Sequence, residues 1–347
     1  MTQLSICIPV YNFGPFISQT LDSIWEQCQS LRDATEVLVV DGASTDNTAA
    51  VVTERAARWQ QLRYVRLPRR GGIDADLAES VRLARGEYCW LFSGDDVMRK
   101  GALERALQWL PDGHDVYLCK HSNCDLNMNP FGEQPVLRSD SIRIAELSDP
   151  LQRLDYMSDG VTSEAVFSFM SGIIVRRDKW LSAPDPQEFM GSCWAHVARL
   201  FTVAQTQLCV CYVGETWVDR RGGNDSFLDR GIVNRLRIAV DGFHRIADRF
   251  FGNASPEAAQ IRRMVGNDLD LLVWLHAKCR TSEAPAFESR SELNRLMTRC
   301  YGDPTVKSWF MRGTYHLTPV RAYRSLQKVY RHVKGVRKRL TRATLSL

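Results

Sequence analysis

The sequence predicts an α/β fold in which a mostly parallel sheet is covered by helices on both faces. Short apolar runs alternate with helix-periodic segments over about the first 110 residues, a pattern typical of right-handed βαβ units. The run at 88–92 is apolar throughout and rich in aromatic residues, as in a strand buried on both faces. Several runs end in small or acidic residues, which such a fold gathers at the carboxyl edge of the sheet.

The elements of this first half follow from local signals. Apolar runs predict the strands, Pro15 suits the first turn of the first helix, and Thr45 or Asp46 can cap the second helix. The polar, glycine-containing loop at 68–76 separates the third strand from its helix. The expected strands cover 4–10, 36–40, 63–67 and 88–92, and the expected helices cover about 15–29, 49–56, 77–84 and the residues from 103 onward.

The second half adds strands and then becomes helical. Apolar runs predict strands at 116–119, 167–175 and 208–213, and a helix is expected from about 179. Three prolines between 128 and 151 indicate an irregular surface excursion. Beyond 231 the apolar spacing predicts helices, at 233–251, 255–279 and 289–301.

Composition favours a soluble globular protein. The chain has 347 residues, 44% hydrophobic and 24% charged, with a formal net charge of +5. No apolar run reaches the roughly 18 to 20 residues of a spanning helix, and no signal peptide is recognisable. The ten cysteines fit reduced thiols of a cytoplasmic protein. Cys119, His121 and Cys124 have the spacing of half a zinc site, but no second pair completes it.

Two adjacent carboxylates, Asp95 and Asp96, follow the fourth strand. Like charges at this spacing repel unless a cation lies between them and a ligand, and a hard divalent cation carrying a diphosphate meets that need with oxygen ligands. The alternative is a polar turn that caps the helix from residue 103.

Four motifs, IPVYN, VVDGASTDNT, RRGGIDADLAESVRLARGEY and LFSGDD, occur in this order between residues 8 and 96. Together they make the chain resemble glycosyltransferase family 2 enzymes of the GT-A fold. The resemblance implies a catalytic domain at 1–230, with a nucleotide-binding half at 1–110 and an acceptor half at 111–230, followed by a helical region at 231–347.

By this resemblance, a nucleotide site is expected along the carboxyl edge. Its implied residues are Pro9, Tyr11, Asn12, Asp41, Arg70, Asp74 and Asp95. The family's aspartates after the fourth strand hold Mg2+ or Mn2+. Ser93 stands where the first Asp of the usual Asp-x-Asp-Asp motif would be, so the metal is assigned to Asp95, with Asp96 as its neighbour.

The catalytic base is less well marked. Family members commonly carry a Glu-Asp pair here, but the corresponding stretch at 188–196 lacks it. His196 and Glu188 are the nearby groups that can accept a proton, with Glu164 and Asp159 as the next candidates. His196 can equally be a structural residue of its helix. The phrase GSCWAHV is similar to a subset of the family that includes abequosyltransferases of O-antigen assembly, and implies a deoxysugar donor.

Two basic features complete the prediction. Arg220 and Arg221, in a glycine-rich stretch at 218–226, suit a clamp on a diphosphate, or else a solvated turn. The end of the chain, from about 321, is a basic amphipathic segment that fits an anionic membrane surface, or a helix packed on protein.

The predicted function is metal-dependent, inverting sugar transfer from a UDP- or CDP-linked donor to a saccharide acceptor. The acceptor is expected to be a lipid-linked oligosaccharide of bacterial surface polysaccharide such as O-antigen or capsule. The enzyme is then cytoplasmic, peripheral on the inner face of the plasma membrane, and its oligomeric state is open. No nucleic-acid partner is expected, because no reader motif is present. The alternatives are an inactive sugar-nucleotide binding module and a nucleotidyltransferase.

Overall fold

The computed structural model describes residues 2–29, 31, 33–224, 230–283 and 289–325. Its contacts divide the chain into two compact units, one formed by Met1–Asp225 with Gly242–Met264, the other by Ser226–Asp241 with Val265–Leu347. Residues 242–264, which were assigned to the helical region, therefore belong to the first unit. Within the described ranges, no helix combines the length and apolarity needed to cross a membrane.

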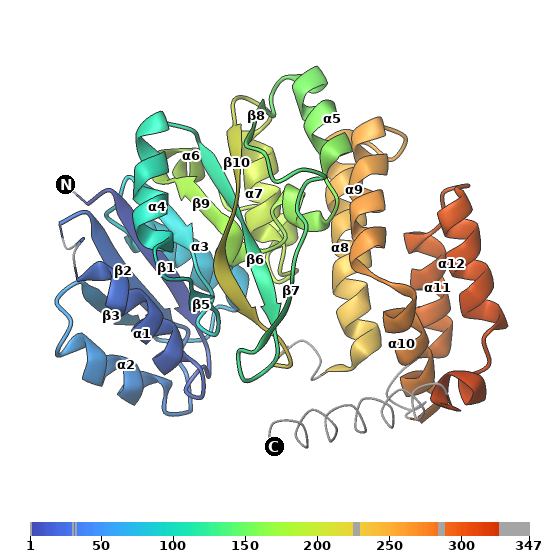
Figure 1. Cartoon of the computed structure of the whole chain (residues 1–347), viewed down its shortest axis with the longest axis horizontal. Helices are drawn as coiled ribbons and strands as arrows, with labels where there is room; N and C mark the ends of the chain where they lie inside the picture. Colours follow the sequence, from blue (N-terminus) through green and yellow to red (C-terminus); the bar gives the residue numbers. More distant parts are fainter. Residues whose placement is uncertain (1, 30, 32, 225–229, 284–288, 326–347) are drawn as a thin grey trace, which may run out of the picture. The chain divides into compact units, whose positions relative to one another are not determined.

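The first unit is built on a mixed sheet (Figure 1). Its main path has the order β3-β2-β1-β4-β9-β6-β10-β5, with β7 paired to β6 and β8 paired to β10. The strands are β1 (Leu4–Val10), β2 (Thr35–Asp41), β3 (Leu62–Arg66), β4 (Tyr88–Leu91), β5 (Val97–Met98), β6 (Val116–Cys124), β7 (Pro130–Glu133), β8 (Arg143–Glu146), β9 (Ile173–Arg176) and β10 (Cys209–Arg221).

Strand direction decides which loops share an edge. β1 is parallel to β2 and β4, and β6 is parallel to β10. β9 is antiparallel to both β4 and β6, so β6 runs the same way as β4. The carboxyl ends of β1, β2, β4, β6 and β10 consequently open at one edge of the sheet, as the predicted fold class requires.

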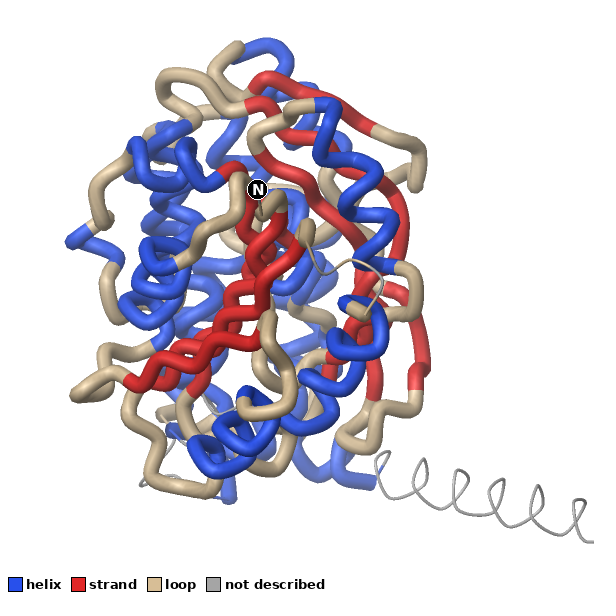
Figure 2. The backbone as a smooth tube through the Cα atoms, turned by 90° about the vertical axis from the view of Figure 1, so that its left-hand side faces the viewer, coloured by secondary structure: helices blue, strands red, loops and turns tan. Residues whose placement is uncertain are grey.

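Helices cover both faces of this sheet (Figure 2). One group is α1 (Ile17–Cys28), α2 (Thr48–Ala56) and α4 (Ala102–Trp109); the other is α3 (Ile73–Leu83), α6 (Arg177–Ser182) and α7 (Ala195–Val203). On α1 the buried apolar residues recur every three or four positions and join a core with Trp90 and Phe92. All four residues of β4 are buried, which confirms the predicted strand covered on both faces, and all seven residues of β1 are buried as well.

Several predicted boundaries were wrong. α3 begins at Ile73 rather than 77, so Asp74 and Asp76 lie in its first turn. The segment 128–151, predicted to be an irregular excursion, contains two strands: β7 pairs with β6, and β8 pairs with β10. Only Ile173–Arg176 of the predicted strand at 167–175 is extended; short 3-10 turns η2 (Ser163–Val166) and η3 (Met170–Gly172) precede it. β10 continues through Arg221, into the stretch predicted as a loop.

The remaining elements are mostly helical. They are the 3-10 turns η1 (Leu110–Asp112) and η4 (Gln187–Phe189), and the helices α5 (Pro150–Asp159), α8 (Ile232–Phe251), α9 (Pro256–Asp268), α10 (Leu271–Glu283), α11 (Arg290–Cys300) and α12 (Val306–Leu317). The helix predicted at 255–279 is two helices, α9 and α10. Most of the basic C-terminal segment, residues 326–347, lies outside the described residues.

Candidate active site

Asp41 closes β2 at the carboxyl edge, where its carboxylate is completely buried. One oxygen accepts the backbone N–H of Ser44 at 2.7 Å, and the other accepts the hydroxyl of Tyr64 at 2.6 Å. These two donors fix the direction of the carboxylate, so it is a preorganised acceptor at the predicted nucleotide site.

Tyr11 and Arg70 form a flat surface beside Asp41. The guanidinium carbon of Arg70 lies 3.9 Å from the centroid of the Tyr11 ring, and Arg70 is exposed. A planar base can stack on such a pair. Pro9 lies within β1, and Asn12 has a support role: its side-chain oxygen accepts the N–H of Thr45 at 2.8 Å, which joins the loop after β1 to the loop after β2.

Asp76 is a candidate site residue that sequence reasoning missed. Its Oδ1 is buried without a hydrogen-bond partner among the described residues, and a Cβ on Gly42 would lie only 2.3 Å from its Oδ2. Burial is the main cause that raises the pKa of Asp76 to about 6, and the charge of Asp41 adds to it. The backbone N–H groups of Gly71 and Gly72 act in the opposite direction, so Asp76 is a buried carboxylate near Asp41 whose hydrogen-bonding capacity is only partly met.

Asp95 and Asp96 follow β4 with different environments. Asp96 is buried, and its oxygens accept the Ser171 hydroxyl at 2.6 Å and the Arg221 backbone N–H at 3.0 Å. Burial first, and the charge of Asp95 second, raise the pKa of Asp96. Asp95 is partly exposed and contacts the side chains of Ser93 and Asn224. The hydroxyl of Ser93, where the family pattern has Asp, thus orients Asp95.

These carboxylates fit a divalent cation that takes other ligands from its substrate. Asp95 offers partly exposed oxygen atoms, which suit Mg2+ or Mn2+, and a cation here would offset the repulsion that Asp96 experiences. Within the described ranges, no group of three or more metal-ligating side chains occurs. The protein would therefore hold such a cation mainly through Asp95, as the sequence predicts.

The two predicted clamp arginines have different places. The Arg221 guanidinium is buried and donates to the carbonyls of Asp95 at 2.9 Å and Leu126 at 2.7 Å, and to Gln19 Oε1 at 2.6 Å. This placement corrects the clamp prediction for Arg221: its hydrogen-bonding groups stabilise the turn that holds Asp95. Arg220 is exposed and contacts Asn123 at 3.2 Å, so the clamp prediction rests on Arg220 alone.

Asp74, predicted to bind nucleotide, is also committed to protein contacts. Its buried carboxylate accepts the backbone N–H groups of Cys193 at 2.9 Å and Ala195 at 3.1 Å. Burial raises the pKa of Asp74, although the N–H groups of Cys193 and Ala195 act in the opposite direction. This placement corrects the prediction, since Asp74 stabilises the start of α7 and the loop where the family's Glu-Asp pair would be.

His196 and Glu188 were the predicted bases. His196 is buried and its Nε2 lies 3.0 Å from the Phe167 carbonyl, to which it donates. Phe167 has a φ of 72°, so the contact supports a strained backbone position. This favours the structural alternative for His196. Glu188 lies at the surface, and its carboxylate accepts the Arg249 guanidinium at 2.8 Å.

A second buried pair lies at the carboxyl end of β6. His121 Nε2 is 2.7 Å from Glu164 Oε1, with His121 fully buried and the Glu164 side chain 13% exposed. Glu164 Oε2 and His121 Nδ1 are buried with no hydrogen-bond partner among the described residues. Ser171, the partner of Asp96, lies seven residues after Glu164 on the same connection before β9. No local signal marks the pair, because its members are 43 residues apart.

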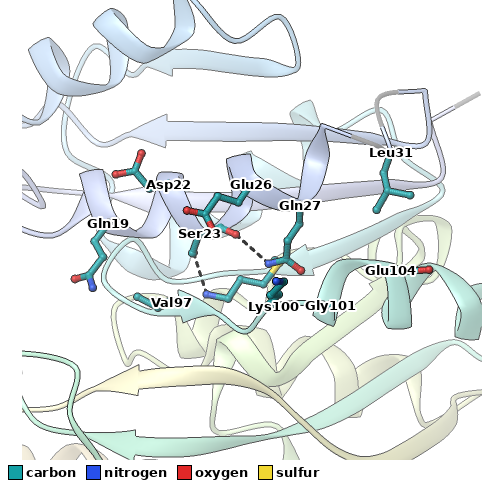
Figure 3. Close-up of a pocket in the computed structure, with 11 residues that line it drawn as sticks. Gln19, Asp22, Ser23, Glu26, Gln27, Leu31, Val97, Lys100, Gly101 and Glu104 are labelled. Atoms are coloured by element: carbon teal, nitrogen blue, oxygen red, sulfur yellow. Dashed lines mark hydrogen bonds between the residues drawn. The ribbon is translucent and has the colours of Figure 1, made fainter.

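Two other features lie away from this edge. A pocket of about 470 Å³ lies between α1 and the turn before α4, lined by Asp22, Glu26, Lys100 and Glu104 among others (Figure 3). Its lining includes neither Asp41 nor Asp95, so it is separate from the candidate site. The ten cysteines are free thiols.

Comparisons with known proteins identify the family. The family model described as "Glycosyl transferase family 2" matches residues 5–168. The abequosyltransferase RfbV of Salmonella typhimurium is 31% identical over 252 residues, 72% of this chain and 75% of that protein. The poly(ribitol-phosphate) beta-glucosyltransferase of Bacillus spizizenii is 32% identical over 104 residues, 30% of this chain and 16% of that protein.

Solved structures show the same fold. S. aureus TarS 1–349 in complex with UDP-GlcNAc has a TM-score of 0.56 at 14% identity, covering 95% of this chain and 92% of that chain. The mannosyltransferase PcManGT from Pyrobaculum calidifontis, in complex with GDP-Man and Mn2+, has a TM-score of 0.52 at 20% identity, covering 90% and 84%. The chain belongs to glycosyltransferase family 2, and its fold is GT-A.

Proposed function

We propose that this protein transfers a sugar, with inversion, from a nucleotide-sugar to a saccharide acceptor. The observation that carries the proposal is the shared edge: the preorganised carboxylate of Asp41 and the Tyr11–Arg70 surface lie at the same edge as Asp95. A nucleotide at Asp41 would direct its diphosphate along this edge toward Asp95. The similarity to an abequosyltransferase and to a poly(ribitol-phosphate) beta-glucosyltransferase supports a role in surface polysaccharide assembly.

For the donor, we assign the base and ribose to Asp41, Tyr11 and Arg70, with Asp76 as an additional acceptor. Asp95 would hold Mg2+ or Mn2+, and such a cation supplies charge stabilisation for the departing diphosphate. Arg220 is the exposed cation available to the same phosphates. UDP- and CDP-linked sugars remain the proposed donors, and a deoxysugar is the proposed cargo.

For the acceptor, we assign proton removal to Glu164. The acceptor oxygen attacks the anomeric carbon, the bond from that carbon to the diphosphate breaks, and the hydroxyl proton passes to the free Oε2 of Glu164. His121 would keep the carboxylate in place through its 2.7 Å contact. Glu188 is the competing base, but its carboxylate lies at the surface and is already engaged by the Arg249 guanidinium at 2.8 Å.

We further propose that the acceptor is lipid-linked and that the enzyme works at the cytoplasmic face of the plasma membrane. The support is compositional: residues 304–347 contain eleven basic and no acidic residues, whereas the rest of the chain contains 34 basic and 40 acidic residues. Such segregated positive charge suits an anionic leaflet.

Incubation with a panel of nucleotide-sugars, with and without saccharide acceptors, tests this function. Slow, cation-dependent hydrolysis of one donor, accelerated transfer when an acceptor is added, and inversion at the anomeric carbon are expected. Tight donor binding without hydrolysis or transfer would favour an inactive binding module. Release of diphosphate from a sugar phosphate and a nucleoside triphosphate would favour a nucleotidyltransferase.

A further inference from the structure

Helix α12 carries an exposed apolar face. Four large side chains are mostly in solvent: Val306 is 90% exposed, Trp309 80%, Phe310 63% and Leu317 82%. At 3.6 residues per turn, all four lie on one side of the helix. We call this set the α12 apolar face. Single exposed apolar residues are common on protein surfaces, but a contiguous set with two aromatic side chains is not. Such a set indicates a surface that binds another molecule.

The opposite side of α12 already has its packing partners. Met311 and Tyr315 are buried, and the Tyr315 hydroxyl donates to Asn294 of α11 at 2.7 Å. Helices α10, α11 and α12 lie side by side in the second unit (Figure 1). Because the opposite side of α12 packs into the core of this unit, the α12 apolar face must point outward.

The C-terminal end of α12 is also fixed. Lys278, buried on α10, donates from Nζ to the carbonyls of Tyr315 at 2.6 Å and Thr318 at 2.9 Å. The last carbonyls of a helix have no partner within the helix, and a cation beside them interacts favourably with the negative end of the helix dipole. Tyr323 then packs with Leu275 and Cys279, so the chain is anchored on α10 just before the basic residues 326–347 begin.

We infer that the α12 apolar face inserts into the interfacial region of an anionic lipid bilayer. Positive charge lies next to the face: Arg312 is exposed on α12 itself, and Arg321 is exposed just after its end. Lys307, also on α12, donates from Nζ to the carbonyl of Gly266 at 3.2 Å, so we do not count it among the charges available to lipid. An exposed aromatic pair next to basic residues matches a surface with an apolar interior and negative headgroups, where Trp is favoured at the interface. This inference rests on the proposed membrane-surface function and names the side chains that enter the lipid.

Vesicle binding by the full-length chain tests it. Co-sedimentation would use phosphatidylcholine vesicles with and without about one third phosphatidylglycerol, a content that gives the surface a strong negative potential. The parent should bind the anionic vesicles. The double variant Trp309→Glu with Phe310→Glu should lower the apparent partition coefficient at least tenfold. The double variant Leu151→Glu with Phe131→Glu also adds two charges, at apolar side chains of α5 and β7 that are 81% and 75% exposed, and is the matched control; it should bind as the parent does.

Three outcomes would overturn the inference. They are no binding of the parent to anionic vesicles, equal binding by the double variant of Trp309 and Phe310, or a parental oligomer that this variant converts to monomer without loss of vesicle binding. The last result would make the face a contact with a second copy. Since the assay contains neither donor nor acceptor, these outcomes leave the transferase proposal to its own test.

Discussion

Replacing Asp74 by alanine should destabilise the fold while leaving nucleotide binding almost unchanged. The change removes the carboxylate that accepts the Cys193 and Ala195 N–H groups. Each charge-assisted hydrogen bond contributes about 1.5–3 kcal/mol. Burial raises the pKa of Asp74, which shows that desolvation offsets part of this gain. We therefore expect a loss of about 2–4 kcal/mol in the free energy of unfolding.

Thermal unfolding by circular dichroism and calorimetric titration with UDP and CDP measure the two effects. For a unit of this size, the loss corresponds to a fall of roughly 4 to 16 °C in Tm. Glu79→Ala, on the same helix, removes only a surface ion pair with Arg82 and should change stability by less than about 0.5 kcal/mol. An Asp74→Ala protein with parental Tm and tenfold weaker nucleotide binding would refute the structural role and restore the original assignment to the nucleotide site.

Five further substitutions test the site and the burial of His196. Asp95→Asn should abolish transfer and remove the cation dependence of nucleotide binding; near-normal turnover in chelator would exclude Asp95 as a ligand. Asp41→Ala should weaken free nucleotide and nucleotide-sugar about equally in calorimetry, whereas parental affinity would remove it from the site. Glu164→Gln should lower kcat by about a hundredfold or more with donor binding intact, whereas Glu188→Gln should leave kcat almost unchanged. A large loss of kcat in Glu188→Gln and none in Glu164→Gln would return the role of base to Glu188. Burial lowers the pKa of His196 to about 4 in the folded protein, below its value in the unfolded chain. Between about pH 6.5 and pH 4 the unfolded chain therefore binds a proton at His196 that the folded protein does not, and the free energy of unfolding falls as the pH drops through this range. His196→Gln should remove about 3 kcal/mol of that pH dependence in urea unfolding at pH 7 and pH 4, and an unchanged dependence would contradict the burial argument.

The sequence by itself determined the fold class, the family and the outline of the nucleotide half. Apolar runs and helical spacing are local signals, so β1, β2 and β4 were predicted to within a residue or two. Asp41 and Asp95 were equally accessible to prediction, since a carboxylate directly after a parallel strand must lie at the carboxyl edge. The elements of 128–175 were not. β8 and β9 are held by partners far along the chain, and β7, which pairs with the adjacent β6, carries no apolar run that would mark it as a strand.

Only the tertiary structure decided what the individual polar side chains do. Asp74 meets the N–H of Cys193 across 119 residues, and Arg221 meets the carbonyl of Asp95 across 126. Partners so far apart leave no spacing pattern in the sequence. The sequence of a motif therefore does not distinguish a charged residue that binds ligand from one that binds another part of the protein. The same holds for Glu164 and His121, whose unpaired buried atoms become visible only when two distant segments are packed together.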